Sequence, residues 1–120
     1  MVHQHNDFWR TLETLVASCP LTIDRPKGSP HPRYSMFVYP YDYGYLENTQ
    51  GGDGSGIDVW VGSLPAKTVT AVVCTVDPSK RDAEVKVLVG CTPQEAQDIL
   101  AIHNSGPWAA LLIERPGDKG

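Results

Sequence analysis

The chain has 120 residues, a hydrophobic content of 41% and a charged content of 20%, values typical of one globular domain spanning residues 1–120. Its formal net charge of −4 argues against nucleic acid or an anionic membrane as a partner. The sequence has no run of roughly 18 apolar residues that could span a bilayer, and its N-terminal segment carries charges that a secretion signal would not have.

The first part of the chain predicts a helix followed by a short strand. Residues 6–18 carry apolar side chains at helical spacing, with Asn6 as a suitable N-cap, and Pro20 ends the helix. Residues 21–24 are typical of a strand. The segment 25–33 contains three prolines and one glycine, which predicts an irregular loop.

Two further strands are predicted on either side of a glycine-rich stretch. Residues 34–40 are compatible with a strand. Residues 51–56, Gly-Gly-Asp-Gly-Ser-Gly, are either a plain turn or a loop that holds a metal. Residues 57–63 alternate in character, so Asp58 and Trp60 lie on the face opposite the aliphatic side chains.

The clearest strands are residues 68–76 and 83–90, which are rich in β-branched side chains and joined by a short hairpin loop. Asp77 closes the first of these strands and Asp82 opens the second. A hairpin places both carboxylates at the same end of the sheet, within reach of a common ligand. Cys74 lies in an apolar run, which favours a reduced thiol in a core and a cytoplasmic location.

The C-terminal part predicts a second helix and a last strand. Thr92 is a suitable N-cap, Pro93 occupies the first helical position, and Glu95 completes a capping box. Gly106 is suited to end the helix, and residues 108–114 are typical of a strand. Together, these elements predict an α+β fold, with a small, largely antiparallel barrel or sheet and a helix near each end of the chain.

Acidic and basic side chains gather near the predicted loops. Taken singly, each is more simply explained as solvated surface. Taken together, they supply oxygen ligands for a hard cation such as Mg²⁺ and cationic groups for phosphate oxygens. A site of this composition is suited to metal-assisted phosphoryl hydrolysis. The acids are Asp24, Asp53, Asp58, Asp77 and Asp82, and the cations are Arg25, Lys27, Arg33, Lys80 and Arg81.

Four segments in a fixed order resemble the soluble, Mg²⁺-dependent inorganic pyrophosphatases: "IDRPKGSPHPRY", "YPYDYGYLENT", "DGSGIDVWVG" and "TVDPSKRDAEVKV", between residues 23 and 89. The resemblance implies an OB-like β-barrel and a divalent cofactor, Mg²⁺ or Mn²⁺. It also implies hydrolysis of pyrophosphate, or of another small diphosphate, by a metal-activated water. Members of this family commonly form closed oligomers, so the resemblance further implies a homo-oligomer.

The resemblance assigns roles to particular positions. Tyr43 and Asp58 match active-site residues, and Ser55 stands where the family has a catalytic aspartate. Arg33 stands at a phosphate-binding lysine. Arg25 and Lys27, in the loop before it, are further phosphate ligands or, as an equally good alternative, solvent-exposed charge. The metal ligands implied by the resemblance are Asp53, Asp58, Asp77 and Asp82.

Several positions depart from the family pattern. Ser55 is neutral and cannot act as the base that activates the attacking water. Ser35 replaces a glutamate, and Glu84 stands where the family has a lysine. A segment that carries a phosphate-binding arginine in the family is missing between Tyr34 and Tyr39.

Three interpretations stay open. The chain is a compact phosphoanhydride hydrolase, or a catalytically impaired relative that binds a phosphate ligand or a partner protein, or a structural domain whose acids are only solvated. Phosphate release from pyrophosphate separates the first two. A shift of the unfolding midpoint by Mg²⁺ tests the third. His103, near the end of the second helix, is either a candidate base or a surface residue favoured by the helix dipole.

Overall fold

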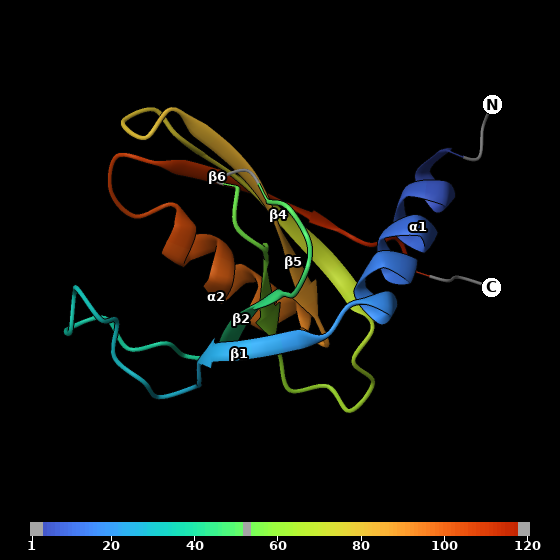
Figure 1. Cartoon of the computed structure of the whole chain (residues 1–120), viewed down its shortest axis with the longest axis horizontal. Helices are drawn as coiled ribbons and strands as arrows, with labels where there is room; N and C mark the ends of the chain where they lie inside the picture. Colours follow the sequence, from blue (N-terminus) through green and yellow to red (C-terminus); the bar gives the residue numbers. More distant parts are fainter. Residues whose placement is uncertain (1–3, 52–53, 118–120) are drawn as a thin grey trace.

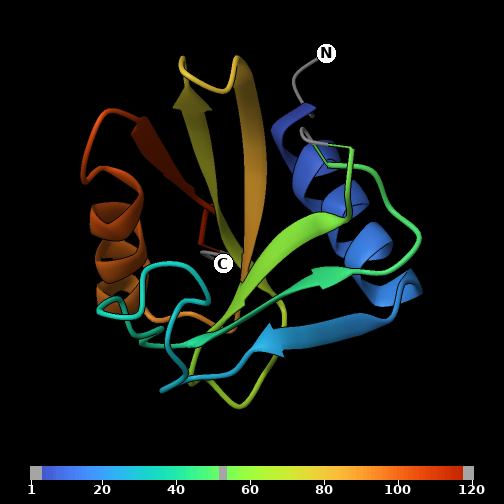
Figure 2. The same cartoon turned by 60° about the vertical axis from the view of Figure 1, so that its left-hand side comes forward.

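The computed structural model of the chain describes residues 4–51 and 54–117, and it is built around one sheet with a helix on either side (Figure 1, Figure 2). In chain order the elements are α1 (Gln4–Ser18), β1 (Leu21–Arg25), β2 (Asp42–Leu46), β3 (Ile57–Val61), β4 (Val69–Asp77), β5 (Asp82–Val89), α2 (Pro93–His103) and β6 (Ala109–Glu114). The strands lie in the order β1-β2-β3-β5-β4-β6. In the described part of the chain, no helix has the length and apolar character that crossing a membrane would require.

The α+β class is confirmed, whereas the OB-like barrel is not. Within the described residues the sheet is open, because β1 pairs with β2 alone and β6 pairs with β4 alone. Four of the five strand pairings in this part of the chain are antiparallel. The exception is the parallel pairing of β3 with β5, so the sheet is mixed.

The local predictions for the second half of the chain are confirmed. β4 and β5 form the expected hairpin, with Asp77 paired to Asp82 at its end. The hydroxyl of Thr92 accepts from the backbone N–H of Glu95, and the Glu95 side chain accepts from the backbone N–H of Thr92, which completes the capping box of α2. The helix ends at His103, and Gly106 adopts a φ of 104° shortly after it.

The strand predicted over residues 34–40 is wrong. This segment forms an isolated bridge between Pro30 and Val38, and it belongs to a loop that projects from the sheet (Figure 1). Proline supplies no backbone donor, and the chain closes on itself instead. The backbone N–H of Phe37 donates to the Tyr34 carbonyl at 2.9 Å, and that of Tyr39 donates to the Ser29 carbonyl at 3.0 Å.

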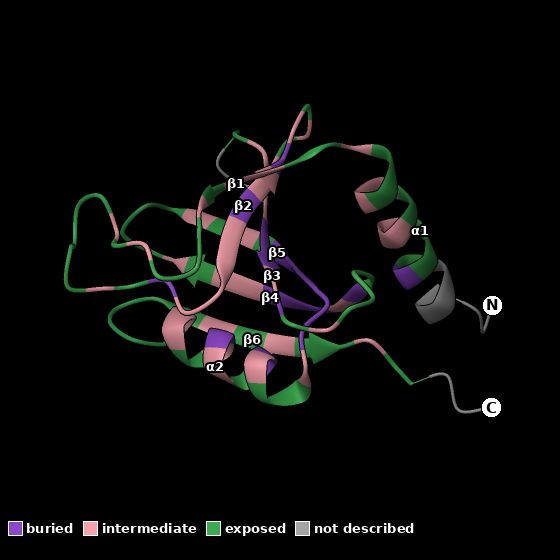
Figure 3. Ribbon diagram, turned by 90° about the horizontal axis from the view of Figure 1, so that it is seen from below, coloured by how far each residue is buried: buried purple, intermediate pink, exposed green. Residues whose placement is uncertain are grey.

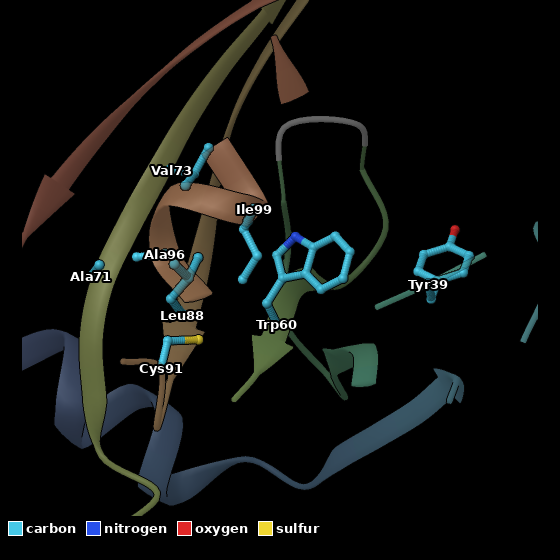
Figure 4. Packing of buried hydrophobic residues seen from close by; sticks show 8 residues of the cluster. All are labelled: Tyr39, Trp60, Ala71, Val73, Leu88, Cys91, Ala96 and Ile99. Atoms are coloured by element: carbon cyan, nitrogen blue, oxygen red, sulfur yellow. The ribbon is translucent and has the colours of Figure 1, made fainter. Parts of the chain in front are cut away.

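Two hydrophobic clusters cover the two faces of the sheet, and burial is concentrated in its central strands (Figure 3). The predicted alternation in β3 holds, but both of its faces are buried. Val59 packs with Trp9 of α1 on one face. Trp60 packs with Ile99 of α2 on the other, where the indole ring lies between Ile99 and Tyr39 (Figure 4). Burying such a side chain contributes about 1.5–3 kcal/mol, so both helices are fixed to β3 and its neighbours.

Candidate functional site

A cleft of about 660 Å³ lies between the projecting loop, the β4–β5 hairpin and the C-terminal end of α2. A larger hollow of about 820 Å³ lies against α1, β4 and the start of α2, but none of the predicted site residues lines it. The smaller cleft is therefore the candidate site. The predicted residues that line it, among those that the structure describes, are Arg33, Tyr43, Asp77, Lys80, Asp82 and His103.

Aromatic rings form the floor of this cleft. Tyr43 of β2 is paired in register with Trp60 of β3, and their ring centroids lie 4.6 Å apart. Tyr39 lies against Tyr43 at 5.6 Å, and the ring of His31 stacks on Tyr39 at 6.1 Å with an interplanar angle of 7°. These contacts attach the projecting loop to the sheet, because two of the four rings belong to that loop.

Lys86 extends from β5 into a group of oxygens beside this floor. Its Nζ lies 2.6 Å from Asp58 Oδ2, 3.1 Å from Glu84 Oε1 and 3.1 Å from the Tyr43 hydroxyl oxygen. The side chain of Lys86 is only 10% exposed. Alternation explains the geometry: Asp58 lies two residues before Trp60, so both side chains point to the α2 face, where Lys86 and Glu84 also lie.

The charges around Lys86 fix its protonation. Burial alone would lower the pKa of the Lys86 ammonium, but the neighbouring oxygens of Tyr43, Asp58 and Glu84 raise it above its ordinary value. Burial also raises the pKa of the Tyr43 phenol. At neutral pH the cluster therefore contains a charged ammonium and a protonated phenol, and Lys86 donates to all three neighbours.

The carboxylates of Asp77 and Asp82 are direct cross-strand neighbours at the tip of the hairpin, which stands away from β1 and β2 (Figure 2). Asp77 Oδ1 accepts from the hydroxyl and the backbone N–H of Ser79, at 2.7 and 3.0 Å. The hydrogen bond from the Ser79 side chain is the main reason why the pKa of Asp77 lies below its ordinary value. Within the described residues, the hydrogen bonds that Asp77 accepts from Ser79 and Lys80 all go to Oδ1.

The opposed carboxylates of the hairpin are the described groups that best suit a divalent cation. Two like charges directly opposite each other destabilise a hairpin, so a cation between Asp77 and Asp82 would relieve that repulsion. Mg²⁺ commonly binds through one or two carboxylates, with waters and substrate phosphates completing its shell. The hairpin pair therefore fits such an ion, whereas Asp58 is already ion-paired with Lys86. Among residues 4–51 and 54–117, no group of three or more His, Cys, Asp or Glu side chains is arranged to hold a metal.

The other predicted site residues lie apart from the cleft. The guanidinium of Arg25 lies 3.5 Å from the Asp24 carboxylate on the exposed end of β1. Lys27 is exposed, and its backbone N–H donates to Asp42 at 2.8 Å. Ser55 lies on the exposed loop before β3. The predicted ligand Asp53 lies outside the described residues.

His103 reaches the cleft from the last turn of α2, but its environment differs from that of a surface residue. The indole N–H of Trp60 donates to His103 Nε2 at 3.1 Å. Burial, reinforced by the nearby charge of Lys86, lowers the pKa of His103 to about 4. The imidazole is therefore neutral at physiological pH, and its Nε2 lone pair is engaged by the indole.

Sequence reasoning missed the importance of Lys86. The signal was present, because Asp82, Glu84 and Lys86 occupy every second position of one strand and so face the same side. What the pattern did not reveal was the partner strand: the parallel pairing of β3 with β5 brings Asp58 to Lys86.

Opposed carboxylates, nearby cations and an aromatic floor are the features that this cleft brings together. The family model described as Inorganic Pyrophosphatase matches residues 4–112. The chain therefore belongs to the inorganic pyrophosphatase family, as the four sequence segments predicted. A curated inorganic pyrophosphatase from Leifsonia xyli subsp. xyli (strain CTCB07) is 57% identical over 28 residues, which cover 23% of this chain and 17% of that protein. No solved structure matches the chain.

Proposed function

We propose that this chain binds pyrophosphate, or another small diphosphate, together with Mg²⁺ or Mn²⁺ in the 660 Å³ cleft and hydrolyses its phosphoanhydride bond. The observation that carries the proposal is the opposed pair Asp77 and Asp82 at the mouth of this cleft. Family membership supports the same reaction.

The charges of the cleft explain why a cation is needed. Three basic and three acidic side chains among the described residues line it, and Asp58 adds one more carboxylate behind Lys86. A diphosphate would therefore meet a site with no excess of positive charge. The lining charges are Arg33, Lys80, Lys86, Asp77, Asp82 and Glu84.

The residues of the cleft have distinct tasks in this proposal. Asp77 and Asp82 hold the divalent cation, which supplies Lewis-acid polarisation of a phosphoryl oxygen when it is bound. Arg33 and Lys80 reach phosphate oxygens from the two sides of the cleft and stabilise charge on the leaving phosphate. The aromatic floor of Tyr39, Tyr43 and Trp60 excludes water from below, which strengthens these electrostatic contacts.

The test combines binding and turnover. Calorimetry should detect pyrophosphate binding with Mg²⁺ and a strong loss of affinity in EDTA, and phosphate release should require the same metal. Asp82→Asn should abolish both signals, while the matched variant Glu114→Gln, which removes an exposed carboxylate outside the cleft, should keep both. Equal binding with and without metal, or full turnover by Asp82→Asn, would contradict the proposal.

A second candidate function is binding without turnover. It is favoured by Ser55, which lacks the carboxylate that the family pattern has at this position, and by the ion pair of Asp58 with Lys86. In that case the chain binds the diphosphate or a partner protein in the same cleft. Metal-dependent pyrophosphate binding with no phosphate release over many hours would select this function.

Two broader predictions belong to the same proposal. Cys19, Cys74 and Cys91 are free thiols, which supports a reducing cytoplasmic location. We also expect a homo-oligomer, as the resemblance to the family implies. Sedimentation velocity over a range of protein concentrations measures the oligomeric state directly.

A further inference from the structure

The ammonium group of Lys86 has the surroundings of a bound cation. Each of the three donors of an ammonium needs an acceptor when it is buried, and Nζ has three oxygens within 3.1 Å. Two of these oxygens are carboxylates, those of Asp58 at 2.6 Å and Glu84 at 3.1 Å. Their side chains are 24% and 15% exposed, so this group lies below the surface of the cleft.

We propose that Lys86 is a built-in cation that occupies the place of a divalent metal between Asp58 and Glu84, so that the cleft binds metal at the hairpin carboxylates alone. The proposal rests on the proposed function for the role of Asp77 and Asp82. Its claim about Lys86, however, is independent of catalysis, because it concerns how many metal ions the chain can hold.

Electrostatics favours the lysine over a metal at this position. A divalent cation bound to Asp58 would lie next to the ammonium of Lys86, and the two positive charges would repel each other. The ammonium of Lys86 cannot move far, because Lys86 belongs to the central strand β5. Its side chain lies on the same face of the sheet as Val73 and Leu88. The tethered ammonium is therefore always at high local concentration, whereas a metal ion must be drawn from solution.

The neighbouring hairpin site differs from this one. Within the described residues, the ion pairs of Lys86 involve Asp58 and Glu84, and neither Asp77 nor Asp82 takes part in them. Asp77 and Asp82 lie directly opposite each other in the hairpin register.

The test counts bound Mn²⁺ by electron paramagnetic resonance in the absence of substrate. The wild-type chain should bind one Mn²⁺, and Lys86→Met, which keeps the stem and removes the charge, should bind a second. Adding Asp58→Asn to Lys86→Met should remove the gained site. Lys80→Met removes a positive charge from the same cleft without touching the Asp58 pair, and it should leave the number of Mn²⁺ ions unchanged. A folded Lys86→Met chain that gains no Mn²⁺ overturns the proposal, and so does a gained site that survives Asp58→Asn.

A second variant covers the case in which Lys86→Met does not fold. Asp58→Asn in the otherwise unchanged chain should keep the wild-type number of Mn²⁺ ions, because Asp58 binds lysine and not metal there. A loss of one ion in this variant would overturn the proposal. The outcomes are distinct from those of the proposed function. A wild-type chain that binds no Mn²⁺ contradicts the hairpin site, while a gain in Lys86→Met that depends on Asp58 still supports the built-in cation.

Discussion

Trp60 donates its indole N–H to Nε2 of His103 at 3.1 Å, and this hydrogen bond ties the central strand β3 to the last turn of α2. Nε2 can accept only while the imidazole is neutral. The low pKa of His103, about 4, agrees with this geometry because burial disfavours the charged ring. The pair therefore links the stability of the domain to pH.

The first prediction concerns this link. An unfolded histidine titrates near its ordinary pKa of about 6.5, whereas the folded His103 titrates at about 4. Between these values the unfolded chain binds more protons, so stability is full above pH 6.5 and falls as the pH is lowered toward 4. We expect a loss on the order of 1–2 kcal/mol at pH 5. Urea unfolding at pH 7 and pH 5 measures it.

His103→Gln is the control for that experiment, since its amide oxygen can still accept from Trp60 but does not titrate. The difference in pH dependence between the wild-type chain and this variant isolates the imidazole from the carboxylates. Identical pH profiles for the two proteins would show that His103 has the same pKa in the folded and the unfolded chain, which would contradict the prediction.

The second prediction concerns Ser55. Because Ser55 lies on the exposed loop before β3 and outside the lining of the cleft, Ser55→Asp should change phosphate release by less than about twofold, far below the 10²–10⁴-fold that a well-placed general base contributes. Ser55→Asn has the same shape without the charge and should behave in the same way. A Ser55→Asp chain that releases phosphate at least about tenfold faster than the wild type would place this loop at the reacting atoms.

The third prediction concerns the start of α2. Thr92→Ala removes the side chain that caps the Glu95 backbone N–H, which should destabilise the domain by about 1 kcal/mol. Thr92→Ser keeps the hydroxyl and should lose much less. The denaturant midpoints of the three chains give the comparison, and a midpoint for Thr92→Ala equal to that of the wild type contradicts it.

The fourth prediction concerns Gly44 in β2. A Cβ at this position would overlap the Thr22 carbonyl oxygen of the neighbouring edge strand β1, and backbone cannot move aside as a flexible side chain can. We expect Gly44→Ala to cost about 1–3 kcal/mol, as overpacking generally does. Gly117→Ala faces open space and should stay within about 0.5 kcal/mol of the wild type. Thermal unfolding of both variants is the measurement.

Local chemistry made much of the fold predictable. The capping residues of α2 and the short loop between β4 and β5 act over a few neighbouring positions, so Thr92, Glu95 and the opposed Asp77 and Asp82 could be placed from the sequence. The projecting loop was mistaken for a strand because its aromatic side chains suit a sheet, while its prolines remove the donors that a sheet needs.

The candidate site was predictable only in part, because its centre depends on strands that are distant in sequence. The hydrogen-bonded partners of β3 cannot be read from its alternation, and only the pairing with β5 brings Asp58 to Lys86. The closure of the sheet into a barrel could not be predicted for the same reason. Closure depends on whether β1 meets β6, and neither strand carries a pattern that specifies its neighbour.

The parallel pairing of β3 with β5 also has a consequence for the order of folding. β4 and β5 are joined by a short turn, so their hairpin can form by closing a small loop, whereas β3 can join β5 only after the chain has travelled through β4 and returned. We expect the β4–β5 hairpin to be structured in the folding transition state and the β1–β2 edge to form later, as φ-values at Val72 and Leu46 would report. In this order the pairing of β3 with β5 forms late. The ion pair between Asp58 and Lys86 therefore forms only in the final stage of folding.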